Sequence, residues 1–375
     1  MGRKSLTEEE LREVLNAHNL TSNNEEAADY LDMGYNKYIS RLRIARERLI
    51  YNIPDGHRLK GVSTYNNIEE DGTRTPMREW VKTDIDLERQ MEMLTEAVEA
   101  LKSDIKPTKK TKAPKIINDS LLSTYLITDY HIGCLSWKDE TGEEWNTELA
   151  EDMLVAWFER AINSAPDAHT AIFAQLGDFL HYDSLTAITP TSGNVLDTDT
   201  RYQNIVKVAV RAVRRIITML LKKHQHVHIL MCEGNHDLSS SVWLRSLFEI
   251  LYEKEPRITV DNTHSPFYAY EWGKTSLFFH HGHKVKMGTI SATFAGIYRD
   301  IFGRTKYSYA HMGHMHHKDV KENSMMIVEQ HPTLAAKDAY STRGGYISQR
   351  GACVITYSKL HGEISRAVVR PEMVM

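Results

Sequence analysis

Five short polar segments, each directly after an apolar run of strand length, constrain this chain more than any other feature. The segments are Asp129-Tyr130-His131, Gly177-Asp178, Gly234-Asn235-His236-Asp237, His281-Gly282-His283 and Gly313-His314-Met315-His316. The runs before them, at 121–128, 170–176, 227–232, 275–279 and 307–312, predict strands, and 145–165 and 203–223 predict helices between them. Open α/β sheets carry their sites at the carboxyl ends of strands, so we expect the five segments to meet at one edge.

The side chains in these segments are donors that borderline divalent metals accept. Imidazole and carboxylate ligands suit manganese, iron or zinc, and the amide oxygen of Asn235 adds a neutral ligand. A carboxylate shared by two ions, with neutral imidazoles around it, would hold a metal pair. The pattern therefore predicts metal-assisted chemistry at the strand ends.

In their order and placement, the five segments resemble the calcineurin-like metallophosphoesterase superfamily over roughly residues 119–370. The resemblance implies an α/β fold, a two-sheet sandwich flanked by helices, and phosphate-ester hydrolysis by a hydroxide that two metals activate. It implies one ion held by Asp129, His131, Asp178 and His316, and a second held by Asp178, Asn235, His281 and His314. Asp178 would bridge them. We expect manganese first, with iron, zinc and magnesium as the other options.

Two further residues of the third segment have predicted catalytic roles. His236 is the candidate general acid for the leaving oxygen, and Asp237 is expected to orient it. The alternative for His236 is an incidental neighbour in a tight turn. Among three neighbouring histidines, the resemblance favours His281 as the ligand, which leaves His283 as a ligand's partner or a substrate-facing residue and His280 as structural.

A narrower resemblance concerns the kind of ester. The segments Asp129-Tyr-His-Ile-Gly, Gly177-Asp-Phe-Leu-His181 and Glu233-Gly-Asn-His-Asp are closest to the DNA-repair nuclease branch that includes the SbcCD-type enzymes. In that branch a histidine at the position of His181 contacts substrate phosphate. The chain departs from it by an N-terminal extension and by little sequence after Gly313-His-Met-His, which puts processive double-strand exonuclease action in doubt.

The extension resembles the helix-turn-helix units of phage and prophage phosphoesterases. Residues 1–102 are predicted to form a small, mainly helical and winged domain, followed by a Lys/Pro linker at 103–118 and a catalytic domain at 119–375. The basic helix 36–49 presents the candidate DNA contacts Lys37, Arg41, Arg43, Arg46 and Arg48. The alternative is a solvated surface on a packing bundle. A hairpin around Asp71-Gly72 would supply the wing.

These features predict a metal-dependent DNA nuclease. The alternative is a phosphomonoesterase or small-nucleotide phosphodiesterase whose first domain recruits a protein, and the intact ligand set disfavours a purely regulatory DNA-binding protein. The seam of apolar residues at 86–101 favours packing on its own domain over a dimer zipper, and a homodimer stays open.

Charge, cysteine content and hydropathy limit the binding partners and the cellular location that we expect. A net charge of -4 excludes a uniformly basic nucleic-acid coat, so any DNA surface must be local. Three widely spaced cysteines without a C-x-x-C pair argue against a disulfide framework. With no apolar segment long enough to span a bilayer and no secretory leader, we expect a cytoplasmic protein without membrane contact. The string His224-x-His226-x-His228 precedes its strand, so we expect a partly exposed strand start rather than a metal site.

Overall fold

The structure is a computed structural model, and it describes residues 6–51, 53, 57–68, 74–85, 111–115, 117–190 and 193–374. The chain divides into two compact units, Met1–Asp104 and Ile105–Met375. The division falls inside the stretch predicted as a linker. The seam at 86–101 and the hairpin turn at 69–73 lie outside the described residues.

The described residues of the first unit form three helices and a hairpin: α1 (Glu8–Leu20), α2 (Asn24–Tyr30), α3 (Tyr35–Ala45) with a π-helical turn, η1 (Arg46–Ile50), and the antiparallel strands β1 (His57–Ile68) and β2 (Arg74–Ile85). Val14, Ala27, Ala28, Tyr38 and Leu42 form the helical core. Thr7 and Glu10 close a capping box at the start of α1, and the side chain of Asn23 caps α2. β1 and β2 pair antiparallel, as the predicted hairpin requires.

The second unit begins with a six-stranded sheet of order β13-β12-β3-β4-β5-β6. Four neighbouring strands, β3 (Asn118–Ile127), β4 (Ala168–Gln175), β5 (His226–Met231) and the edge strand β6 (Ile258–Val260), are parallel. β12 (Ala352–Ser358) pairs antiparallel with β3, and β13 (Gly362–Val369) pairs antiparallel with β12. The helices α5 (Lys138–Thr141), α6 (Thr147–Ser164), α7 (Tyr202–Lys223) and α8 (Leu238–Leu251) lie within the connections between these strands. Parallel β3, β4 and β5 therefore point their carboxyl ends the same way.

A five-stranded sheet of order β10-β11-β9-β8-β7 completes the unit. Its strands are β7 (Tyr268–Trp272), β8 (Thr275–His280), β9 (Tyr307–Met312), β10 (Asp319–Glu322) and β11 (Ile327–Gln330). β8, β9 and β11 are parallel neighbours. The remaining helices are α9 (Met287–Ile297), α10 (Arg299–Arg304), α11 (Ala339–Arg343) and the 3-10 turn η2 (Pro371–Met373).

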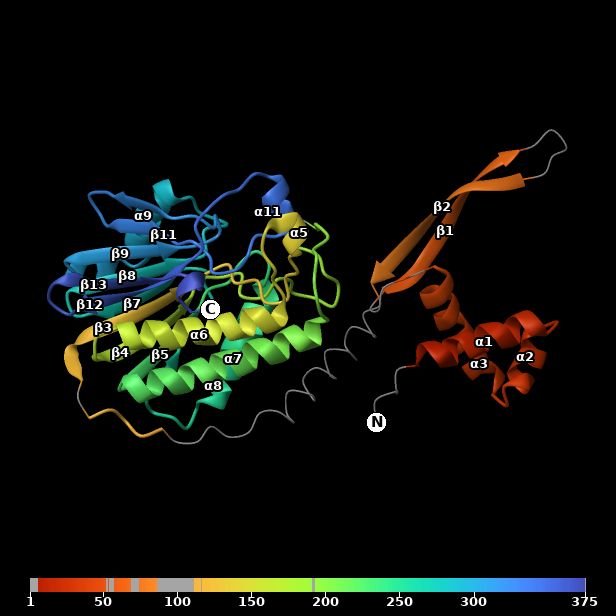
Figure 1. The fold of residues 1–375 in the computed structure, drawn as a ribbon, viewed down its shortest axis with the longest axis horizontal. Helices are drawn as coiled ribbons and strands as arrows, with labels where there is room; N and C mark the ends of the chain where they lie inside the picture. The colour runs from red at the N-terminus through yellow and green to blue at the C-terminus, as the bar shows by residue number, and fades with distance from the viewer. Residues whose placement is uncertain are drawn as a thin grey trace. The chain divides into compact units, whose positions relative to one another are not determined.

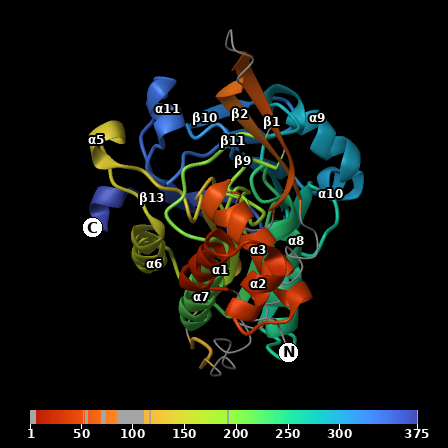
Figure 2. The same ribbon diagram turned by 90° about the vertical axis from the view of Figure 1, so that its right-hand side faces the viewer.

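Strand alternation builds the core between the two sheets. Leu126, Ile172 and Leu230 of one sheet pack with Leu277 and Phe279 of the other in one buried cluster. The next residue, Phe278, faces the opposite way and packs on Ile290 and Phe294 of α9. In Figures 1 and 2, α9 and α10 lie on one side of the paired sheets, and α6 and α7 lie side by side on the other. The predicted mixed α/β architecture is confirmed, with helices flanking both sheets.

His224 corrects one expectation from the sequence. Its side chain is fully buried, whereas a partly exposed strand start was expected. Nδ1 lies 2.7 Å from the carbonyl oxygen of Ala168, and Nε2 lies 2.8 Å from the Tyr125 hydroxyl. A neutral ring satisfies both contacts by donating from Nδ1 and accepting at Nε2. Burial lowers the pKa of His224 to about 4.

This buried imidazole predicts an acid-sensitive fold. Because burial lowers the folded-state pKa, the stability that the neutral ring supports is complete above pH 6.5 and is lost as pH falls towards 4. The loss from this group is expected to reach about 3 kcal/mol. In urea denaturation at pH 7, His224→Gln should be less stable than the wild type, and the gap should shrink by pH 5. A gap that stays constant would contradict the prediction.

No helix in the described parts of the chain is long and apolar enough to cross a membrane.

Candidate metal centre

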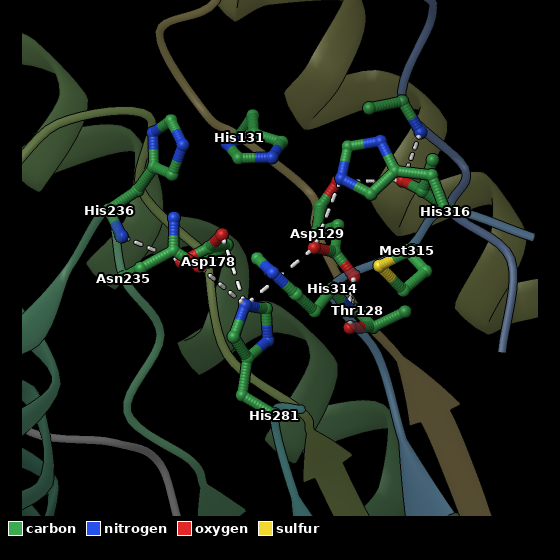
Figure 3. A network of polar contacts seen from close by, with 12 residues as sticks. Thr128, Asp129, His131, Asp178, Asn235, His236, His281, His314, Met315 and His316 are labelled. Atoms are coloured by element: carbon green, nitrogen blue, oxygen red, sulfur yellow. Dashed lines mark hydrogen bonds and ion pairs between the residues drawn. The ribbon is translucent and has the colours of Figure 1, made fainter. Parts of the chain in front are cut away.

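The five polar segments converge because backbone hydrogen bonds join the ends of neighbouring strands. The Asp129 N–H donates to the carbonyl of Gly177 at 3.0 Å, and the His131 N–H donates to the carbonyl of Asp178 at 3.0 Å. On the second sheet, the Gly313 N–H donates to the carbonyl of His281 at 2.8 Å. The side chains of all seven predicted ligands meet in this region (Figure 3).

The backbone at this centre is strained. Among the described residues, six that are not glycine have positive φ, and five of them are predicted ligands: Asp129, His131, Asp178, His314 and His316. Their φ angles lie between 48° and 75°, a region that costs an L-residue about 1–2 kcal/mol. Packing alone gives no reason for such a concentration. Strain of this kind gathers at functional sites, where it aims side chains at a common point.

Asp129 is held so that one carboxylate oxygen remains available. Oδ2 accepts hydrogen bonds from the Thr128 hydroxyl at 2.5 Å and from the His314 N–H at 2.8 Å. Oδ1 is buried without a hydrogen-bond donor, and its neighbours are Nε2 of His316 at 3.1 Å and Nε2 of His281 at 3.9 Å. Burial disfavours the charged carboxylate, yet His316 and His281 lower the pKa of Asp129. An orphaned, ionised oxygen among imidazoles fits a metal cation.

His281 has the tautomer that a metal ligand needs. Nδ1 lies 2.8 Å from the carbonyl oxygen of Leu176 and can only donate there, which leaves a lone pair on Nε2. That nitrogen lies 3.1 Å from Oδ2 of Asp178 and 3.2 Å from Oδ1 of Asn235. At these distances Nε2 either carries a proton that it donates to the two oxygens or shares a metal ion with them. Burial acts against the imidazolium, but Asp178 and Asp129 raise the pKa of His281 to about 10. A proton and a metal would therefore compete for one position.

Three groups of donor atoms overlap at the centre; one is His131, His181 and His236, and the other two share Asp129. Of the two that share Asp129, one consists of Asp129, Asp178, His281 and His314, and the other consists of Asp129, His131 and His316. Each group has its donor atoms within 4.8 Å of one another. The residue common to both is Asp129, whereas the resemblance assigns the bridge to Asp178. Both carboxylates lie at the centre (Figure 3), and Asp178 as the bridge stays a prediction.

His181 is buried next to the predicted ligand His131. Its side chain is only 2% exposed, and its Nδ1 is 3.4 Å from Nδ1 of His131. Burial, with His236 nearby, lowers the pKa of both His131 and His181, the latter to about 4. Neutral imidazoles are the form that binds metals. The predicted contact between His181 and a substrate phosphate stays a prediction.

His236 and Asp237 have separate partners. Nδ1 of His236 lies 2.7 Å from the carbonyl oxygen of His181, so it donates there and leaves Nε2 free. The Asp237 carboxylate accepts from the backbone N–H groups of Asp178, Phe179, Leu180 and Gly234. Asp237 therefore fixes the loop that carries Asp178, and the group that orients His236 is the His181 carbonyl. Burial and the Asp178 carboxylate raise the pKa of Asp237 to about 7.

Several residues at the centre escaped sequence reasoning. Thr128 orients Asp129, and Asp183 accepts from the N–H groups of Ser239 and Ser240 at the start of α8, directly after Asn235-His236. Gly234 and Gly313 let the Asp178 and Asp129 carboxylates approach the backbone. Thr128 stands beside a predicted ligand, but nothing in residue spacing singles out Asp183, because its contact is made 56 residues along the chain.

In the first unit, the candidate DNA contacts lie on α3 and η1. Lys37, Arg43 and Arg46 are exposed, while Arg41 and Arg48 are half-buried. The guanidinium of Arg46 lies 2.7 Å from Nε2 of His18, and Tyr38 contacts the other nitrogen of that ring. Lys37 and Arg43 are thus the most accessible cations of the set, and their role stays a prediction.

The strained backbone predicts an inverted glycine effect at His316. Its side chain is partly exposed and its φ is 54°, so both His316→Gly and His316→Ala remove the imidazole with little loss of packing. In metal-free protein we expect the glycine variant to be more stable by about 1 kcal/mol, because alanine resists positive φ. Urea denaturation would measure it. The same pair at His317, which lacks positive φ, should favour alanine. Equal stability of the two His316 variants would refute the strain.

Comparison with protein-family models and with curated protein sequences finds no match. Among solved structures, similar folds include a predicted phosphoesterase from Streptococcus pneumoniae TIGR4 (8% identity, 68% of this chain, 99% of the other, TM-score 0.29). An archaeal phosphodiesterase has 12% identity over 66% of this chain and 99% of its own, with a TM-score of 0.34. Vps29 of Entamoeba histolytica, in a complex with zinc, has 10% identity over 67% and 99%, with a TM-score of 0.27. Likeness at this level does not establish a shared activity, so the activity has to follow from the geometry of the site.

Proposed function

We propose that this protein is a metal-dependent phosphodiesterase that uses two divalent ions and acts on DNA. The observation that carries the proposal is that two groups of donor atoms share Asp129, whose buried Oδ1 has no hydrogen-bond donor. Most of these residues follow strands and have positive φ. Asp129, His131, Asp178 and His316 would hold one ion, and Asp178, Asn235, His281 and His314 the other. Bound ions at this centre would neutralise charge on phosphoryl oxygens and acidify water.

The chain's own residues divide the remaining work. His236 donates from Nδ1 to the His181 carbonyl, so Nε2 is the nitrogen that would take up a second proton and, from the imidazolium form, pass it to the leaving oxygen. The backbone N–H of His236 also donates to Oδ1 of Asp178 at 2.8 Å, which links the candidate acid to the predicted bridging residue. Asp237, through four backbone N–H groups, keeps the Asp178 turn from relaxing.

DNA as the substrate rests on the exposed cations of α3, Lys37 and Arg43, beside a hairpin that suits a winged unit. A second candidate is a phosphomonoesterase or small-nucleotide phosphodiesterase. The burial of His181, which is 2% exposed, means that the phosphate contact implied by the resemblance to DNA nucleases gives DNA no added support over a small ester.

One assay separates the two candidates. Full-length protein with manganese is incubated with single-stranded, duplex and nicked DNA, a phosphomonoester and bis(p-nitrophenyl) phosphate. The DNA proposal expects cleavage of at least one DNA and of the small diester, and loss of both in His236→Ala. Turnover of the monoester with all DNA left intact would establish the second candidate instead. No turnover of any ester would sink both.

The basic helix gives a separate prediction in the full-length protein. Replacing Lys37 and Arg43 with alanine removes two phosphate contacts, so the slope of log Kd against log salt for DNA should fall by about 2. Turnover of bis(p-nitrophenyl) phosphate should not change. Arg12→Ala is the matched control, because Arg12 is paired with Glu8 at 2.7 Å on α1. An unchanged salt slope in the double variant would remove this surface from the proposal.

A further inference from the structure

His283 has both ring nitrogens buried without a hydrogen-bond partner. It stands two residues after His281, between β8 and α9. Other imidazoles of the centre are different, since His281 and His236 each pair Nδ1 with a backbone carbonyl. An unsatisfied buried polar group costs a fold about 1–3 kcal/mol. A neutral imidazole ring offers one donor and one acceptor.

The position of His283 relates it to one half of the metal centre. Its ring centroid lies 5.3 Å from that of His281 and 6.4 Å from that of His314, both members of the donor group that includes Asp178. His236 belongs to the other half, with its ring 4.7 Å from that of His131. The candidate acid His236 thus lies beside the donor group that contains His131, and His283 lies beside the group that contains His281 and His314.

Orientation of a ligand does not explain the ring. A residue that orients a metal-binding histidine does so by a hydrogen bond, and neither nitrogen of His283 makes one. Stacking on His280, with centroids 5.9 Å apart and planes at 10°, holds the ring but uses neither polar atom. The exposed Lys284, the next residue, adds positive charge close to the His283 ring. An anionic substrate oxygen, attracted by this positive charge, can supply the missing acceptor for the ring N–H.

We propose that His283 donates a hydrogen bond to a non-bridging oxygen of the phosphoryl group held at the Asp178, His281 and His314 half of the centre. This inference rests on the proposed phosphoesterase function. It makes His283 a substrate-contacting residue whose unpaired nitrogens lower stability in exchange for phosphate affinity. Replacing the ring by an apolar one of similar shape should then separate the two properties.

The test uses the full-length, manganese-loaded protein and inorganic phosphate as the probe. In calorimetric titration, His283→Phe should bind phosphate about 10- to 100-fold more weakly, as expected for a lost hydrogen bond to an anion. Its Tm should rise by about 4–8 °C, because two unsatisfied buried groups are removed. Metal content should not change. His283→Gln, which keeps a donor, should recover part of the affinity, and His317→Phe, on an exposed ring, should leave it unaltered.

The outcomes are distinct. Unchanged phosphate affinity in His283→Phe would overturn the proposal, and so would a lower Tm with lost metal, which would make His283 structural. Failure of the wild type to bind phosphate would overturn it as well. If the wild type binds phosphate but hydrolyses no ester, the proposed function fails while the titration still decides the role of His283.

Discussion

Asp178→Asn is expected to lower turnover of bis(p-nitrophenyl) phosphate by about 10³-fold and to weaken metal binding, with the fold intact. The carboxylate lies 3.1 Å from Nε2 of His281 and accepts from the His236 N–H at 2.8 Å. Asparagine has nearly the same shape, but it loses the charge that two cations would share. It also tolerates the φ of 53° at this position better than most residues do. The fold should therefore survive while the chemistry does not.

Metal analysis after dialysis, thermal unfolding and steady-state kinetics with manganese would measure these effects. Asp32→Asn is a close control, since Asp32 has a φ of 49° and lies in the first unit. It makes the same substitution in the same backbone conformation without touching the centre. If Asp178→Asn kept its metal and its turnover, the assigned centre would be wrong.

Gly234→Ala is expected to damage the centre although it alters no ligand. A Cβ on Gly234 would lie 2.0 Å from Oδ1 of Asp178 and 2.3 Å from its backbone nitrogen. Neither atom can move aside freely, because the backbone N–H of His236 donates to that oxygen and the Asp178 nitrogen donates to Asp237. We expect unfolding free energy to fall by about 1–3 kcal/mol from overpacking. Displacing the carboxylate by about 1 Å should cost on the order of 10²-fold in turnover.

Gly296→Ala provides the comparison. Gly296 lies within α9, and a Cβ there meets no atom within 4 Å. Alanine should raise helix stability by about 0.5–1 kcal/mol and leave turnover unchanged. Denaturation midpoints and kinetics of the two variants would decide the matter. Equal behaviour of Gly234→Ala and Gly296→Ala would show that the close approach at Gly234 has no functional weight.

Periodicity predicts the buried strands well because their apolar runs are long. All five strands that precede the polar segments are present, and the late strands β12 and β13 lie where apolar patterning would put them. Short strands such as β6, with three residues, and β10, with four, carry too few residues for a pattern to stand out. The burial of His224 was not predicted either, because its partners Tyr125 and Ala168 come from distant parts of the chain.

The five segments of the sequence determined which side chains could bind metal and that strand ends would carry them, since donor type and apolar runs are local properties. The tertiary structure decided how these side chains are held. In it, the His236 ring donates to the His181 carbonyl, and Asp237 accepts from the backbone of the Asp178 turn. Oδ1 of Asp129 and both nitrogens of His283 have no hydrogen-bond partner. Hydrogen bonding and strain depend on atoms far apart in the chain, so residue spacing alone cannot express them.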